Sequence, residues 1–367
     1  MILASTRCKP EMRLLAIAAL VFLPVAGIMA QTNSAASSPP VNVPVPASAI
    51  ALHESSRRNI VSEMGGAFMG SSKCDPDGNL YIRKYAADRP LLGPVVKIDS
   101  DGKRTALFDP VTFSQLELDR ADAFSPASDG GLYQIAQSGV VKPRIYVLHF
   151  SSDASPSSPI RLEADFEVYS FAAFLNGNLL VSGFERDVKN PKDAGRAVSE
   201  VFSADGRLQA QLSFDQPPEP AKTAGKPAAK AAGEAGKSAP TLDLADAEVS
   251  VDGNLYAMRN SSPALIYVIS PAGKVVRTLK VNAPVPGALP GTFHVSKNQL
   301  AVSFRHPDSK TQLVVVADAQ TGRKVATYFD PGSLGSSFAC YSADDGVFTF
   351  LTLGEGNALE VVQAQAR

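Results

Sequence analysis

A short phrase recurs along this chain and limits the folds that the chain can adopt. It is Asp-Gly-Asn-Leu-Tyr or a close variant at residues 77–81, 129–133 and 252–256, with weaker copies at 176–180, 297–301 and 344–348. Each copy combines a tight turn with the start of an apolar strand, which is the signal of a β-hairpin. A hairpin that returns every few tens of residues indicates a repeat architecture rather than an active site.

The copies divide the chain into similar units. In the first unit, residues 66–110, we expect strands at 68–74, 80–84, 95–98 and 104–108, joined in pairs by Gly turns. Two hairpins in tandem form one antiparallel sheet. Similar units follow at 121–165, 166–215, 241–284 and 288–333, and a sixth unit with three strands starts at 338.

The missing strand of the sixth unit has a candidate at the other end of the repeats. The segment Ile50–His53 precedes the first unit and has no sheet of its own. A ring of sheets closes most simply if this strand completes the last unit, because closure removes an open sheet edge. We therefore predict an all-β fold over residues 49–367, a six-bladed β-propeller of four-stranded antiparallel blades whose last blade is closed by an N-terminal strand.

The turn phrase, the second Gly turn of each unit and the count of six resemble the six-bladed β-propellers of the NHL and TolB type. The resemblance covers about residues 50–367. It implies the blade structure but no single activity, because such propellers include lyases, lactonases, sugar dehydrogenases and binding scaffolds.

The N-terminal region has the pattern of an export signal. A basic start, an apolar run and small residues before Ala30 predict that residues 1–30 are a signal peptide, with an uncleaved membrane anchor as the alternative. Residues 31–48 and 216–240 are poor in large apolar residues, which predicts a flexible tether and a disordered insertion. We expect a periplasmic or extracellular monomer with no membrane span after cleavage.

Two cysteines remain after removal of the leader, Cys74 beside the first repeat and Cys340 beside the last. If the ends of the repeat array meet, they could form a disulfide that closes most of the chain into a loop. The alignment places them one position apart, which would direct them to opposite faces of neighbouring strands. Two buried free thiols are therefore the favoured expectation.

Basic residues end the second strand of several units. They are Arg83, Arg186, Arg259 and Arg305, all on the face that carries the connection between the second and third strands. A ring of guanidinium groups suits an anionic ligand, although charged residues also cap strand ends without any function. The whole chain has a formal net charge of -1, so we do not expect a nucleic-acid binder.

Asp122 and Asp246 occupy matching positions at the start of the first strands of the second and fourth units. Two such carboxylates could bind a Ca²⁺ ion or act as an acid/base pair. The alternative is that they form ion pairs with the nearby arginines or cap the turn at the strand entry.

Signals for metal binding and nucleophilic catalysis are otherwise weak. The four histidines have no metal-ligand spacing, and no Gly-x-Ser-x-Gly elbow occurs. We therefore expect a binding or scaffold protein rather than an enzyme, with no cofactor, that recognises an envelope or secreted protein or a small anionic ligand. The alternative is a Ca²⁺-assisted hydrolase or lyase that acts on lactone or sugar-like substrates in the central channel.

Overall fold

The computed structural model describes residues 45–366 except for 140–142, 187–193, 213, 215–243, 260, 308, 310 and 336. The predicted signal peptide, most of the predicted tether and the predicted insertion lie outside the described residues. Most of the described chain forms β-strands, and its one α-helix is the short α1 (Val61–Met64). None of the helices in this part of the chain has the length and apolar character needed to cross a membrane.

Four sheets each contain four antiparallel strands that are consecutive in the chain. The first consists of β2 (Phe68–Cys74), β3 (Leu80–Lys84), β4 (Val95–Ile98) and β5 (Arg104–Phe108). The second consists of β6 (Arg120–Pro126), β7 (Leu132–Ser138), β8 (Arg144–Phe150) and β9 (Ile160–Arg161). The third consists of β10 (Phe166–Ala173), β11 (Leu179–Arg186), β12 (Ala194–Phe202) and β13 (Leu208–Gln211). The fourth consists of β14 (Leu244–Val249), β15 (Leu255–Arg259), β16 (Ala264–Ile269) and β17 (Val275–Val281).

The remaining strands form one eight-stranded sheet, in which β1 (Ile50–Asn59) joins a section of four strands to a section of three. Ile50 and Ala51 pair in parallel with Tyr328 and Phe329, and the rest of β1 pairs antiparallel with the last strand. One section contains β18 (Leu289–Ser296), β19 (Gln299–Arg305), β20 (Gln312–Asp318) and β21 (Lys324–Phe329). The other contains β22 (Ser337–Ser342), β23 (Val347–Leu353) and β24 (Leu359–Ala366).

The all-β propeller is confirmed, and so is the prediction that an N-terminal strand completes the last unit. The expected six separate sheets appear instead as four sheets and one double sheet. The physical reason is that β1 is long enough to hydrogen-bond to the outer strands of two units.

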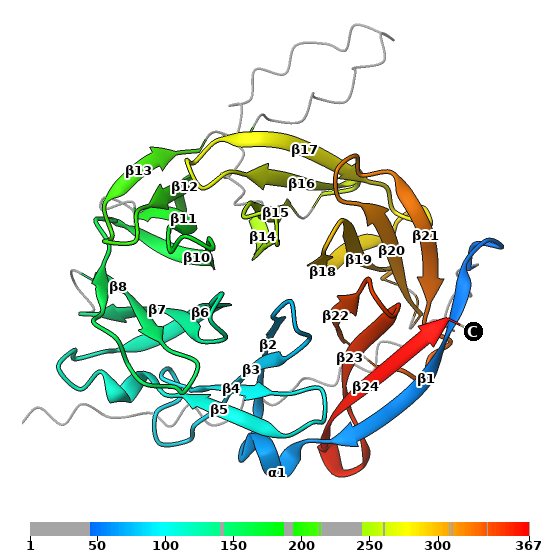
Figure 1. The fold of residues 1–367 in the computed structure, drawn as a ribbon, viewed down its shortest axis with the longest axis horizontal. Helices are drawn as coiled ribbons and strands as arrows, with labels where there is room; N and C mark the ends of the chain where they lie inside the picture. The colour runs from blue at the N-terminus through cyan, green and yellow to red at the C-terminus, as the bar shows by residue number, and fades with distance from the viewer. Residues whose placement is uncertain are drawn as a thin grey trace, which may run out of the picture. The chain divides into compact units, whose positions relative to one another are not determined.

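The innermost strands contact one another in the order β2, β6, β10, β14, β18 and β22, and β22 contacts β2 again (Figure 1). The apolar core lies between adjacent sheets. Phe108 of the first sheet, for example, meets Phe150 of the second edge to face, with ring centroids 5.7 Å apart. Burial of such faces supplies most of the stabilisation of a repeat fold.

The turn phrase forms the hairpin between the first and second strands of a sheet. Gly78, Gly130 and Gly253 have φ values of 80°, 80° and 81°, in the left-handed region that favours glycine. In the first copy, the Asp75 side chain accepts hydrogen bonds from the backbone N–H groups of Asp77 and Asn79. Local turn chemistry therefore explains why the phrase recurs.

The tyrosine of the phrase links its own turn to the next sheet. The Tyr81 hydroxyl donates to Asp75 at 3.2 Å and to the carbonyl of Gly130 in the next turn at 2.9 Å. The Tyr256 hydroxyl lies 3.2 Å from the Asp252 carboxylate. Burial and this carboxylate raise the pKa of Tyr256 to about 12.

We expect this tyrosine to make the protein sensitive to alkali. Its pKa in the fold lies above the ordinary tyrosine value of about 10, so its contribution to stability is complete below about pH 10 and is lost as the pH rises towards 12. Urea unfolding between pH 8 and pH 11.5 measures the loss, and Tyr256→Phe should lose less stability over this window than the wild type. Equal losses in the two proteins would show that Tyr256 ionisation does not couple to folding.

The two cysteines are disulfide-bonded, which corrects the expectation of free thiols. Cys74 on β2 and Cys340 on β22 have Cα atoms 6.0 Å apart and are separated by 266 residues in the chain. Opposite faces would keep two side chains apart on neighbouring strands of one sheet, but β2 and β22 belong to different sheets. In a propeller, adjacent sheets pack face to face. Side chains that meet between two sheets therefore project from opposite faces of the two sheets, which allows the disulfide.

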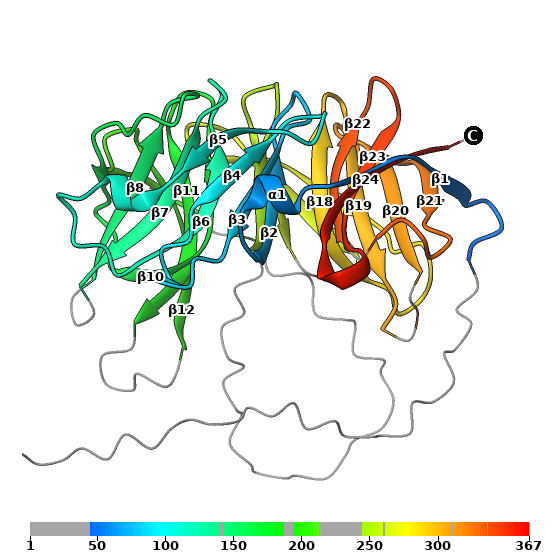
Figure 2. The same ribbon diagram turned by 90° about the horizontal axis from the view of Figure 1, so that it is seen from below.

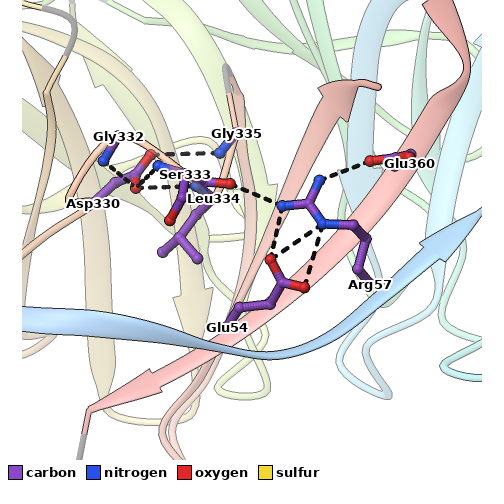
Figure 3. A network of polar contacts seen from close by, with 8 residues as sticks. All are labelled: Glu54, Arg57, Asp330, Gly332, Ser333, Leu334, Gly335 and Glu360. Carbon is purple, nitrogen blue, oxygen red and sulfur yellow. Dashed lines mark hydrogen bonds and ion pairs between the residues drawn. The ribbon is translucent and has the colours of Figure 1, made fainter. Parts of the chain in front are cut away.

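A polar network fixes β1 in the ring, as Figure 3 shows. Arg57 on β1 pairs with Glu54 and with Glu360 on β24, each at 2.7 Å, and it donates to the carbonyl of Ser333 at 2.8 Å. The Asp330 side chain, which is buried, accepts hydrogen bonds from the four backbone N–H groups of residues 332–335. The network ties β1 both to β24 and to the loop between β21 and β22.

The ring has two faces, which we name by their connections. The turn face carries the hairpins between first and second strands, which lie at residues 75–78, 127–130, 174–177 and 250–253. The loop face carries the connections between second and third strands, such as residues 85–94 between β3 and β4. In Figure 2 the turn face is at the top and the loop face at the bottom.

Candidate functional site

A cavity of about 370 Å³ opens on the turn face. Its walls come from the ends of the innermost strands β2, β6, β14 and β18 and from the turns that follow β2, β6, β10 and β14. All the strands that line it are innermost strands of the ring (Figure 1). We call it the axial cavity.

An ion pair crosses the ring beside the axial cavity. Lys73 Nζ on β2 lies 2.8 Å from Asp246 Oδ1 on β14 and donates to the carbonyl of Ala247 at 2.9 Å. The strands β2 and β14 are on opposite sides of the ring, so this contact joins units that share no sheet interface. The Lys73 side chain is only 12% exposed, which shields the pair from solvent and strengthens it relative to a surface ion pair.

A second polar group in the cavity wall has incomplete hydrogen bonding. Glu248 Oε2 accepts the backbone N–H of Val295 at 3.0 Å and lies 3.0 Å from His294 Nδ1. The contact with His294 lacks hydrogen-bond geometry, since His294 Nδ1 is buried without a hydrogen-bond partner in the described structure. Ser250 Oγ is likewise buried and has no partner among the described residues.

Apolar side chains complete the cavity and its rim. Leu175 and Val251 are the second residues of the turns at 174–177 and 250–253, and their side chains are 41% and 60% exposed. Val249 and Val295 lie deeper in the wall. The axial cavity therefore combines an apolar rim with a few buried polar groups.

Two of the predicted site residues contact each other on the loop face. Arg83 Nη1 lies 3.4 Å from Asp122 Oδ1, and Arg83 Nη2 donates to the carbonyl of Leu91 at 3.3 Å. Asp122 also pairs with Arg120. Burial lowers the pKa of Arg83, and the charge of Asp122 opposes this shift. The hollow beside Arg120 and Asp122 has a volume of only about 10 Å³, the space of one water molecule.

Of the other predicted residues, Asp246 lies away from this pair. Asp246 forms an ion pair near the axial cavity with Lys73 rather than with a nearby arginine. Arg259 and Arg305 are the last residues of β15 and β19, the former half-buried and the latter exposed. Arg186 ends β11, and its side chain lies outside the described part of the chain. An anion site formed by the four arginines stays a prediction.

The sequence predicted a pocket on the loop face and did not identify Glu248 and Ser250 of the axial cavity. Asp246 and Glu248 lie on β14 and Ser250 directly follows it, so the three alternate along the chain and lie on one side of it. This alternation of polar residues before a turn phrase was the available signal. The alternation could not be interpreted from the sequence alone, because the closed ring decides which side of β14 faces the axis.

No group of three or more His, Cys, Asp or Glu side chains with the arrangement of a metal-ion site occurs among the described residues. Asp122 and Asp246 each contact a basic side chain, Arg83 and Lys73 respectively.

No known family model matches the chain, and no curated protein matches it. Several solved structures resemble it at low identity. A protein of unknown function from Bacteroides caccae is 11% identical, with 71% of this chain and 80% of that chain covered and a TM-score of 0.43. The WD40 domain of Pan2 from Neurospora crassa is 11% identical, with 86% and 96% covered and a TM-score of 0.40. The hydrazine synthase of Kuenenia stuttgartiensis is 12% identical, with 67% and 62% covered and a TM-score of 0.37.

Proposed function

We propose that this protein is an exported binding protein that holds a small ligand in the axial cavity. The observation that carries the proposal is the cavity itself, whose volume of about 370 Å³ lies within the range of small-molecule sites. Such sites are mainly apolar and contain a few polar groups that orient the ligand. Ser250 and His294 are polar groups of this kind, because each has a buried atom without a hydrogen-bond partner among the described residues.

The closed ring supports a binding role because it holds the cavity walls in fixed positions. Cys74 lines the cavity, and its disulfide with Cys340 joins the first and last units beside the site. The ion pair of Lys73 with Asp246 restrains the opposite wall. A site preorganised in this way loses little conformational entropy when a ligand binds.

Export forms part of the proposal. A disulfide is typical of a protein that folds in an oxidising compartment, and residues 1–30 have the pattern of a signal peptide. N-terminal sequencing of the protein recovered outside the cytoplasm should start at residue 31. We further propose that the ring is a six-bladed propeller of the NHL and TolB type, in which the double sheet counts as two blades that share β1.

A cavity-filling substitution tests the binding role. We expect Ser250→Leu to weaken the binding of small fragments at least 10-fold, because the larger side chain occupies the volume next to Glu248 and His294. Binding is measured by ligand-observed NMR with a fragment library of mixed charge. The matched control is Ser100→Leu, which makes the same change at an exposed turn residue away from the cavity.

Fragments that bind both variants equally, or no binding fragment for the wild type, would contradict the proposal. Thermal unfolding of both variants verifies that a loss of binding does not result from a loss of folding.

A further inference from the structure

More acidic than basic side chains line the axial cavity, and the one basic side chain is already paired. One basic side chain, Lys73, and three acidic ones, Asp75, Asp77 and Glu248, line it. Lys73 is paired with Asp246. The lining therefore has an excess of negative charge.

Two of the three acidic groups have an evident structural role or access to water. Asp75 accepts hydrogen bonds from its own turn and lies 3.5 Å from Lys97 Nζ. Asp77 is an exposed residue of the same turn. Neither requires a ligand to balance its charge.

Glu248 differs from both. It is 9% exposed, and within the described structure it has no lysine or arginine at ion-pair distance. Its Oε2 atom accepts the Val295 N–H, whereas its Oε1 atom has no hydrogen-bond donor among the described groups. Most of this side chain is shielded from water and no cation of the described structure offsets its charge, so this side of the cavity is suited to a positively charged donor.

Ser250 and the rim extend the same site. Ser250 lies two residues beyond Glu248 on the same side of the chain, with a buried hydroxyl that has no partner among the described residues. Leu175 and Val251 offer exposed apolar surface at the mouth. A ligand that spans the cavity would place its polar end at Glu248 and Ser250 and its apolar body against the rim.

Building on the proposed function, we infer that the ligand is a small organic amine whose protonated nitrogen binds Glu248. The ammonium group donates to Glu248 Oε1, and the apolar body of the amine contacts Leu175 and Val251. The competing partner of this carboxylate is the His294 ring, whose Nδ1 atom lies 3.0 Å from Glu248 Oε2. If His294 already satisfies the carboxylate, the cavity would have no preference for an amine.

Three probes of one shape test the inference on the wild-type protein. Phenethylamine, phenethyl alcohol and phenylacetate share the aromatic body and differ in the charge of the end group. We expect calorimetry at pH 7 to show phenethylamine binding at least 10-fold more tightly than the alcohol, with no measurable binding of phenylacetate. Equal affinity for the amine and the alcohol, or tighter binding of phenylacetate, would overturn the inference.

Two variants test which carboxylate is responsible for the preference for the amine. Glu248→Gln should reduce the affinity for phenethylamine to that for the alcohol and leave the affinity for the alcohol unchanged. Glu355→Gln makes the same change at an exposed residue between β23 and β24, outside the cavity lining, and should preserve the preference. A preference that survives Glu248→Gln would contradict the assignment, and the wild-type probe series remains decisive if this variant does not fold.

Failure of the inference can be separated from failure of the proposed function. If fragments of other charge bind the wild type but not Ser250→Leu, while phenethylamine does not bind, the cavity is a binding site and the amine assignment is wrong. If no fragment binds, the binding role itself is wrong.

Discussion

A chain that begins at residue 60 should not form a stable folded monomer, whereas one that begins at residue 45 should. Only the longer chain contains β1. This strand pairs with β24 from Leu52 to Asn59 and with β21 at Ile50 and Ala51. Its loss would expose the edges of both strands, and unpaired strand edges promote aggregation. It would also remove Leu52, which is fully buried in the apolar cluster that contains Phe348 and Val362.

Size-exclusion chromatography and circular dichroism of the two chains measure this effect. A point variant separates loss of packing from loss of strand pairing: Leu52→Ala retains the backbone pairs and should cost about 2–5 kcal/mol of unfolding free energy. The control is His53→Ala, which changes the neighbouring exposed residue of the same strand. A monomeric, cooperatively folding chain without β1 would show that the ring does not depend on closure by this strand.

The second large effect is expected from the disulfide. Replacing both Cys74 and Cys340 by Ser should lower the free energy of unfolding by about 2–5 kcal/mol, because the bond restricts the unfolded chain over a long loop. The 266 residues between the two cysteines place the expected loss near the upper end of this range. The bond also joins β22 to β2, the contact at which the first and last units of the ring meet.

Urea unfolding with and without dithiothreitol measures the contribution of the disulfide. The reductant should destabilise the wild type and leave the Cys74→Ser/Cys340→Ser variant unchanged, which controls for other effects of the reagent. An unchanged wild-type midpoint after complete reduction, verified by thiol titration, would contradict the prediction.

The strands of the first sheet show how much of the fold follows from local sequence. We predicted strands at 68–74, 80–84, 95–98 and 104–108, and β2 to β5 have these bounds. The turns between them contain Gly78 and Gly102, whose φ values of 80° and 77° few other residues adopt without strain. Turn chemistry and alternating apolar residues are short-range signals, so a single sequence carries them.

The contacts between the cavity side chains could not be predicted from local sequence. Glu248 and His294 are separated by dozens of residues and belong to different sheets, and each is unremarkable in its own strand. They meet because β14 and β18 are neighbours at the axis of the ring. The same is true of Lys73 and Asp246, which contact each other across the ring from opposite units.

The sequence by itself determined the repeat unit, the position of its hairpins and the need for an N-terminal strand to complete the last unit, because these depend on turn residues, strand periodicity and strand count. Only the tertiary structure decided that Cys74 bonds to Cys340, that β1 joins two units into one sheet, and that the cavity opens on the turn face. Each of these depends on which faces of different sheets meet, and that is determined by the twist and closure of the whole ring.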